Sequence, residues 1–280
     1  MSEGAPRIEP FEIEGAAGRP IRGEARLVNG ATASVVVLHG FKGFFRFSFF
    51  PYVAEQIAAA GMNVISFNFS GSGVGPDLES FTDSEAFFDN SFAREMYDVV
   101  RVASASDDRG WLGARYGVLG HSRGGGIAVL HAADNLRVGA LVTWAGISTV
   151  RRWSDVVMTA WRDRGHTEIA NSRTGQVLKL GTRVLDEAVD HGSARLDIRR
   201  AGREVKSPWL IVHGDADETV PIAEAEALRA ASRERAEVLR IPGATHSFNV
   251  SHGSSVRSPE LITATERTVA FFTDSLLGAE

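Results

Sequence analysis

The 280-residue chain contains no cysteine, and this absence removes several kinds of chemistry. Without a thiol there is no disulfide, no thiolate zinc site and no cysteine nucleophile, a composition that suits a reducing compartment. The sequence also lacks an apolar run of the roughly 18 to 20 residues that a membrane-spanning helix needs, and its first residues lack the basic and apolar regions of a secretory signal. We therefore expect a cytoplasmic protein without a membrane span.

The chain also has no excess of positive charge. The chain carries 30 Lys and Arg against 35 Asp and Glu, which gives a formal net charge of -5 and a pI near 5.9. No overall positive field is available to attract phosphate backbones or anionic lipids, so we expect no nucleic-acid partner. No two histidines have the H-x-x-x-H or H-x-H spacing of a metal site, and we expect no metal and no cofactor.

Hydrophobic residues make up 44% and charged residues 23% of the chain, as in an ordinary globular protein. Two alternating segments before residue 28, IEPFEIEG and IRGEARLV, predict an antiparallel pair at a sheet edge. The β-branched run ASVVVLHG at 33–40 is typical of a parallel strand covered on both faces. Strand and helix patterns then alternate, which predicts an α/β fold with a mostly parallel central sheet and helices on both faces.

One interval breaks this alternation. About 60 residues separate the predicted strands VGALVTWAG and SPWLIVHGDAD, far more than one crossover helix needs. An apolar face at helical spacing is formed there by Trp153, Val156, Val157, Ala160 and Trp161. We expect residues 1–146 and 207–280 to form the core and residues 147–206 to form an inserted helical cap. Ordinary surface helices packed at the sheet edge are the alternative.

A serine stands where one predicted strand gives way to a helix. Gly120, Ser122 and Gly124 satisfy the pattern G-x-S-x-G. Such an abrupt change of direction strains the backbone of the central residue and requires neighbours with almost no side chain. The turn would raise the Ser122 hydroxyl above the carboxyl edge of the sheet, at a helix N-terminus that favours developing negative charge. This context favours a nucleophile over an incidental serine in a glycine-rich turn.

A serine nucleophile needs a base, and the base needs a carboxylate that orients it. Asp215 and Asp217 follow the predicted strand LIVHG, and His246 follows the next predicted strand. The carboxyl ends of parallel strands share one edge of a sheet, so these groups are expected to meet near Ser122. His252, in a polar loop six residues beyond His246, is the alternative base.

The ordered motifs LHGF, FNFSGSG, GHSRGG, HGDADETVP and GATHSF resemble those of the α/β-hydrolase superfamily, in particular its small serine esterase and acyl-hydrolase branch. The resemblance covers about residues 33–250. It implies that Ser122 is the nucleophile, His246 the general base and then acid, and Asp217 the orienting carboxylate. In the family pattern this acid lies three residues after the strand-end glycine, which selects Asp217 over Asp215.

An acyl-transfer serine also needs donors for the oxyanion of the tetrahedral intermediate. The family pattern implies the backbone N–H groups of Phe41, in HGFKG, and of Arg123, the residue after the nucleophile. We expect the side chains of Arg123 and Lys42 to be solvated charges at the rim of a cleft. Contact with an anionic group of the substrate is the alternative.

Six phenylalanines crowd after this loop, at positions 41, 44, 45, 47, 49 and 50. They either pack in the core or line an apolar pocket beneath the cap. The candidates for a substrate pocket are Phe44, Phe45, Trp153 and Trp161.

The resemblance implies a serine hydrolase that cleaves carboxylic esters of small to medium acyl groups through an acyl-enzyme, with a small-molecule ester as its partner. A thioesterase or a peptidase or amidase on the same three residues is the alternative, and a non-catalytic binding protein is a more remote one. Neither the acyl and alcohol specificity nor the oligomeric state follows from the sequence.

Overall fold

The structure, a computed structural model, describes residues 5–171, 175–188 and 195–278. Within these residues the main sheet has eight strands in the order β1-β2-β4-β3-β5-β6-β9-β10. They are β1 (Arg7–Glu14), β2 (Pro20–Leu27), β3 (Ser34–Leu38), β4 (Asn63–Asn68), β5 (Tyr116–His121), β6 (Val138–Trp144), β9 (Trp209–Gly214) and β10 (Glu237–Ile241). β2 pairs antiparallel with β1 and β4, and the other neighbours run parallel. The predicted edge pair and parallel centre are both confirmed.

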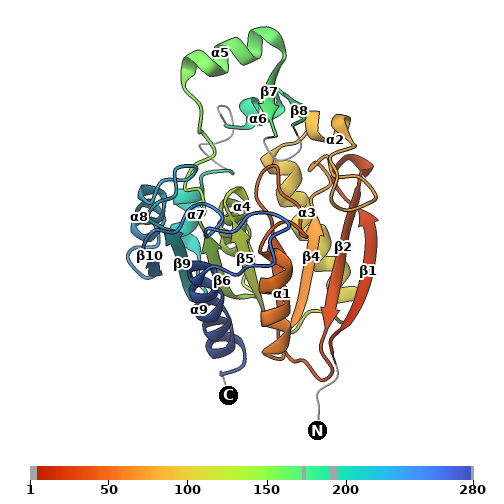
Figure 1. Ribbon diagram of the computed structural model, residues 1–280, viewed down its shortest axis with the longest axis vertical. Coiled ribbons are helices and arrows are strands. Elements are labelled where there is room, and N and C mark those ends of the chain that lie inside the picture. The colour runs from red at the N-terminus through yellow and green to blue at the C-terminus, as the bar shows by residue number, and fades with distance from the viewer. Residues whose placement is uncertain (1–4, 172–174, 189–194, 279–280) are drawn as a thin grey trace.

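Helices cover both faces of this sheet (Figure 1). Outside the insert described below, the helices of the described residues are η1 (Ala16–Gly18), α1 (Phe50–Ala59), α2 (Ser84–Phe88), α3 (Phe92–Asp108), α4 (Arg123–Asp134), α8 (Ala223–Ala231) and α9 (Pro259–Leu276). α1 and α9 contact each other on one face, whereas α3, α4 and α8 lie on the other. Every residue of β3, β4, β5, β6 and β9 is buried, which is why strands such as β3 (SVVVL) and β9 (WLIVHG) carry consecutive apolar residues instead of alternating ones.

Side-chain caps fix where several helices begin. The Ser258 hydroxyl accepts a hydrogen bond from the N–H of Leu261 at 3.0 Å, and Pro259 fits the first helical position of α9. Asp83 caps α2 in the same way, through the N–H of Ala86. Each cap of this kind contributes about 1 kcal/mol. None of the helices in the described residues combines the length and hydropathy needed to cross a bilayer.

The insert between β6 and β9 differs from the predicted helical cap. It contains α5 (Asp155–Arg164), an antiparallel pair of strands β7 (His166–Ala170) and β8 (Val177–Gly181), and the short helices α6 (Arg183–Asp186) and α7 (Ile198–Glu204). α5, β7 and β8 project from one end of the molecule (Figure 1). α7 instead packs against α4 and α8 of the main layer. The hairpin strands are short and half-exposed, and such strands leave little periodicity in a sequence.

The apolar helix face predicted in this insert is wrong for Val156, Val157 and Ala160, which are exposed, and right for Trp161. Val156 is 81% exposed and Val157 is 46% exposed, whereas Met158 and Trp161 are buried. The indole N–H of Trp161 donates to the carbonyl oxygen of Leu180 in β8 at 3.0 Å. α5 therefore turns its Met158 and Trp161 side to the hairpin, and the valines face outward.

Candidate active site

Ser122 lies between β5 and α4 with φ 57° and ψ -119°, a conformation that costs free energy for any residue with a Cβ atom. A Cβ on Gly120 would lie 2.2 Å from the carbonyl oxygen of Gly124. One on Gly124 would lie 2.5 Å from the carbonyl oxygens of Leu38 and His39. The two flanking glycines are therefore required, because the turn at Ser122 packs directly against the end of β3.

The structure brings Asp217 and His246 together. The Nδ1 of His246 donates to Oδ2 of Asp217 at 2.7 Å, and Oδ1 of Asp217 accepts from the N–H groups of Thr219 and Val220 at 2.8 and 2.9 Å. Burial by itself would raise the pKa of Asp217, but the hydrogen bonds outweigh it and hold that pKa below its usual value. The ionised carboxylate fixes the proton on Nδ1, which leaves Nε2 of a neutral His246 as an acceptor.

The rival acid and the rival base have other partners. Asp215 accepts from the N–H of Gly243 at 2.7 Å and from Nε of Arg240 at 3.1 Å, so it ties down the turn that follows β10. The ring of His252 stacks on Phe47 with the centroids 4.9 Å apart. Geometry therefore pairs His246 with Asp217 rather than with Asp215.

His121, the residue before Ser122, contacts the loop that carries His246. Its Nε2 contacts the carbonyl oxygen of His246 at 2.9 Å, and the two ring centroids are 4.6 Å apart. Burial lowers the pKa of His121 to about 3, so the ring is neutral and donates through Nε2. The loop of His246 is thereby held against the residue that precedes Ser122. No sequence signal identified this contact.

The side chain of His246 is 23% exposed and Ser122 is partly exposed, so solvent reaches both groups. Among the described residues, no hydrogen bond joins the Ser122 hydroxyl to His246. Such bonds are often long in an enzyme without substrate and shorten in the complex.

The loop after β3 lies against Ser122. The carbonyl oxygen of Gly40 accepts from Nδ1 of His39 at 2.8 Å and from the N–H of Gly43 at 3.0 Å. In a trans peptide the N–H of Phe41 must point the opposite way. A Cβ on Gly40 would lie 2.9 Å from the Cβ of Ser122, so the loop and the serine touch.

Both predicted oxyanion donors are available. Within the described part of the chain, the backbone N–H groups of Phe41 and Arg123 have no hydrogen-bond partner. They belong to two segments that meet at Ser122, one at the end of β3 and one at the start of α4. An oxyanion hole needs backbone donors without other partners, and both N–H groups meet that one condition.

The expectation that Arg123 is a solvated charge at a rim is wrong. Arg123 is 5% exposed, and its Nε donates to Oε2 of Glu95 in α3 at 2.9 Å. Sequence reasoning missed Glu95, which is itself buried. The Lys42 side chain donates from Nζ to the carbonyl oxygen of Ala170 at 3.2 Å, so it connects this loop to β7.

The four pocket candidates lie inside packed regions. Phe44 and Phe45 are 4% and 3% exposed, and the ring of Phe44 packs edge-on against Phe47. Trp153 and Trp161 pack against each other in the insert, with ring centroids 5.1 Å apart.

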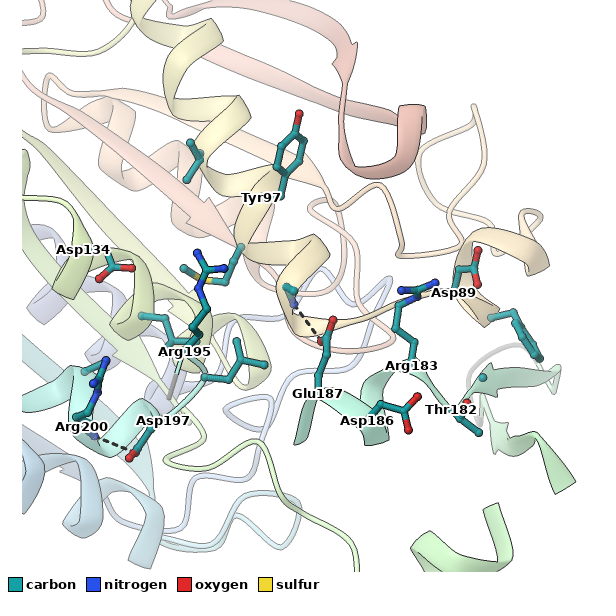
Figure 2. A pocket seen from close by; sticks show the side chains of 18 of the residues that line it. Asp89, Tyr97, Asp134, Thr182, Arg183, Asp186, Glu187, Arg195, Asp197 and Arg200 are labelled. Carbon is teal, nitrogen blue, oxygen red and sulfur yellow. Dashed lines mark hydrogen bonds between the residues drawn. The ribbon is translucent and has the colours of Figure 1, made fainter. Parts of the chain in front are cut away.

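A cavity of about 1070 Å³ lies elsewhere, between α3, α4 and the insert, including its helix α7 (Figure 2). Tyr97 and Leu130 form part of its apolar wall, and its charged groups include Asp134, Arg183 and Arg200. Neither the four pocket candidates nor Ser122, Asp217 and His246 line it. In the residues that the structure describes, no three His, Asp or Glu side chains converge as a metal site would need.

Comparison with known proteins bears on the fold and the family. A search of curated proteins finds no match. Similar solved structures include a putative hydrolase from Agrobacterium vitis S4, with a TM-score of 0.73 and 17% identity over 95% of this chain and 99% of that one. They also include Est1E from Butyrivibrio proteoclasticus with bound ferulic acid, with a TM-score of 0.72 and 18% identity over 95% and 99% of the two chains.

A puromycin-hydrolyzing peptidase from Mycobacterium tuberculosis has a TM-score of 0.68 and 18% identity over 97% of this chain and 39% of that one. At these identities the likeness concerns the fold. The model of the family described as "Alpha/beta hydrolase family" matches residues 35–257, which is most of the chain. The chain therefore belongs to the alpha/beta hydrolase family.

Proposed function

We propose that this protein is a serine hydrolase that cleaves carboxylic esters of small to medium acyl groups through an acyl-enzyme. The observation that carries the proposal is the 2.7 Å hydrogen bond between Asp217 and His246, at the sheet edge where Ser122 takes its strained conformation. Strain at a single residue persists only where the surrounding structure imposes it, and it is common at reacting groups. An ionised carboxylate that orients a neutral imidazole supplies the base that a serine hydroxyl lacks at neutral pH.

Acylation uses these groups in order. Nε2 of His246 takes the hydroxyl proton as Oγ of Ser122 bonds to the ester carbonyl carbon, and the carbonyl electron pair moves to its oxygen. The N–H groups of Phe41 and Arg123 donate to this oxyanion. When the carbonyl re-forms, the bond to the alkoxy oxygen breaks, and that oxygen takes the proton from the imidazolium and leaves as the alcohol.

Deacylation repeats the sequence with water. Nε2 of His246 removes a proton as the water oxygen bonds to the acyl carbon, and the same donors hold the second oxyanion. Collapse breaks the bond to Oγ of Ser122, which recovers its proton from His246, and the carboxylic acid leaves. No redox partner enters either half-reaction.

Esters and amides use the same proton, because His246 gives it to the leaving alcohol of an ester or to the leaving amine of an amide. A peptidase or amidase would in addition need acidic side chains near Ser122 that bind the amine terminus of its substrate. Thioesters follow the same steps as esters. A panel of p-nitrophenyl esters, hydroxycinnamate esters, acyl thioesters and aminoacyl amides separates these classes, and selective cleavage of the amides would overturn the ester assignment.

The nucleophile is tested directly with a fluorophosphonate probe. We expect the probe to label the wild-type protein at Ser122 and to leave the Ser122→Ala variant unlabelled. Equal labelling of the two proteins, or no labelling of the wild type, would reject the assignment. A protein that only binds ligands would also remain unlabelled.

A further inference from the structure

The two proposed oxyanion donors are also joined through their side chains. The guanidinium carbon of Arg123 lies 5.3 Å from the ring centroid of Phe41 and 3.9 Å from that of Phe92. The Phe41 ring packs in turn on Phe87, at 5.4 Å between centroids. The Arg123 side chain thus bridges the loop that carries one donor and the helix that carries the other.

Glu95 fixes this bridge from α3. Its side chain is 5% exposed, and one carboxylate oxygen accepts from Nε of Arg123 at 2.9 Å. The other oxygen accepts from the side-chain amide of Asn90 at 3.0 Å, and the same amide donates to the carbonyl oxygen of Gly71 at 2.9 Å. The carboxylate is therefore held by a separate part of the chain and cannot follow the arginine freely.

Stability alone is a poor reason for such a pair. Moving two charges out of water costs about as much as their attraction returns, and apolar residues of similar size often replace a buried ion pair at no loss of stability. Here the cost is higher still, because Nη2 of Arg123 is buried and has no hydrogen-bond partner among the described residues. The pair instead fixes the orientation of the Arg123 side chain, because a planar guanidinium packs against rings with its faces and donates hydrogen bonds to a carboxylate from its edge.

We propose that the Arg123 side chain, held by Glu95, is a positioning group that sets the spacing between the backbone donors of Phe41 and Arg123. This inference rests on the proposed function. Donors in an oxyanion hole act only within a narrow range of distance from the developing charge, so a link between their two segments affects the transition state more than substrate binding.

The test uses the double variant R123M/E95M, which removes both charges and keeps apolar volume, so that it does not strand one buried charge. We expect kcat for a p-nitrophenyl ester to fall roughly 10- to 100-fold, with KM within about twofold. Phenylboronic acid forms a tetrahedral anion on a reactive serine, and its affinity is expected to fall by the same factor as kcat. A folded double variant with wild-type kcat, or with a lower kcat and unchanged boronate affinity, would overturn the proposal.

The matched control is R26M/E24M, which removes another ion pair of low exposure, 2.9 Å long, on β2, together with the 3.2 Å contact between Glu24 and the partly exposed Arg46. We expect it to keep the wild-type kcat and boronate affinity. Should R123M/E95M fail to fold, Phe41→Leu removes the ring and keeps both backbone donors. This variant is expected to lower kcat several-fold at constant KM, and an unchanged kcat would again overturn the proposal.

Failure of this inference differs from failure of the proposed function. If fluorophosphonate labels Ser122 in the wild type and labels R123M/E95M at the same rate, the serine assignment stands and the positioning role falls. If the wild type is not labelled at Ser122, both fall.

Discussion

Nε2 of His121 donates to the carbonyl oxygen of His246 over 2.9 Å, although 125 residues separate the two in the chain. His121 ends β5 and His246 follows β10, and β6 and β9 lie between these strands in the sheet. Strand pairing therefore fixes their separation only loosely. This one bond ties the proposed base to the residue that precedes the proposed nucleophile.

Replacing His121 by phenylalanine tests this tie, because it retains a ring against Phe49 and removes the donor. We expect kcat to fall about 10- to 100-fold with little change in KM, since a small displacement of a catalytic group is costly. Steady-state kinetics on a p-nitrophenyl ester measures the effect. His131→Phe is the control, because His131 is buried but bonds to Tyr116 rather than to His246. Equal kcat values for the two variants would contradict the role of His121.

Asp217→Asn and Asp215→Asn each remove one carboxylate, but we expect very different effects on kcat. Loss of the carboxylate that holds Nδ1 of His246 favours the wrong tautomer, and we expect kcat to fall on the order of 10³- to 10⁴-fold for Asp217→Asn. Asp215 faces Gly243 and Arg240, so its variant is expected to lose stability and to retain kcat within a few-fold. The reverse order of kcat values would exchange the two roles.

Most of the fold could be predicted from local sequence patterns. Strands such as β3 (SVVVL) are buried on both faces, and a strand of this kind can be recognised from its consecutive apolar residues. The candidate site could also be predicted from the sequence, because Ser122, Asp217 and His246 each follow a predicted strand. Parallel order then sends those strand ends to one edge.

Contacts between distant segments of the chain could not be predicted from the sequence. The Arg123–Glu95 pair joins α4 to α3, and no local rule turns the side chain of Arg123 inward. One signal was present, because Glu95 and Asp98 share the buried face of α3 with Val99 and Val102. Charges on an otherwise apolar helix face call for partners, although their identity requires the structure. The β7–β8 hairpin of the insert has no comparable signal in the sequence.

Alanine at Gly120 should be more damaging than alanine at a glycine with open surroundings. The new methyl group would lie 2.2 Å from the carbonyl oxygen of Gly124, and neither backbone segment can move without disturbing Ser122. We expect a loss of about 3 kcal/mol in the free energy of unfolding, together with loss of activity. Urea unfolding and ester hydrolysis measure the two effects.

Gly30→Ala provides the comparison, because Gly30 has φ +76° but no atom within 4 Å of a new Cβ. Only backbone strain remains there, about 1 kcal/mol, and activity should persist. Equal losses of stability at both sites would mean that the crowding around Gly120 is not what requires glycine.

Buried histidines should make the protein sensitive to mild acid. Burial lowers the pKa of His131 from 6.5 to about 4, so between these values the unfolded chain binds a proton that the folded protein does not. Stability from this group is complete above pH 6.5 and is lost as the pH falls toward 4, at about 1.4 kcal/mol per pH unit. His39, whose pKa burial also lowers to about 4, adds to the effect in the same direction.

The variant His131→Gln isolates one of these contributions, since glutamine can still reach the Tyr116 hydroxyl that His131 contacts at 2.8 Å. The free energy of unfolding is measured with urea at several pH values between 4.5 and 7. Its slope against pH should be smaller in the variant than in the wild type by up to about 1.4 kcal/mol per pH unit, the contribution of one proton. A lower stability of the variant at pH 7 does not affect this comparison, because the slope of stability against pH, and not the absolute free energy of unfolding, reports the proton. A wild-type slope in the variant would show that His131 takes up its proton in the folded protein as readily as in the unfolded chain.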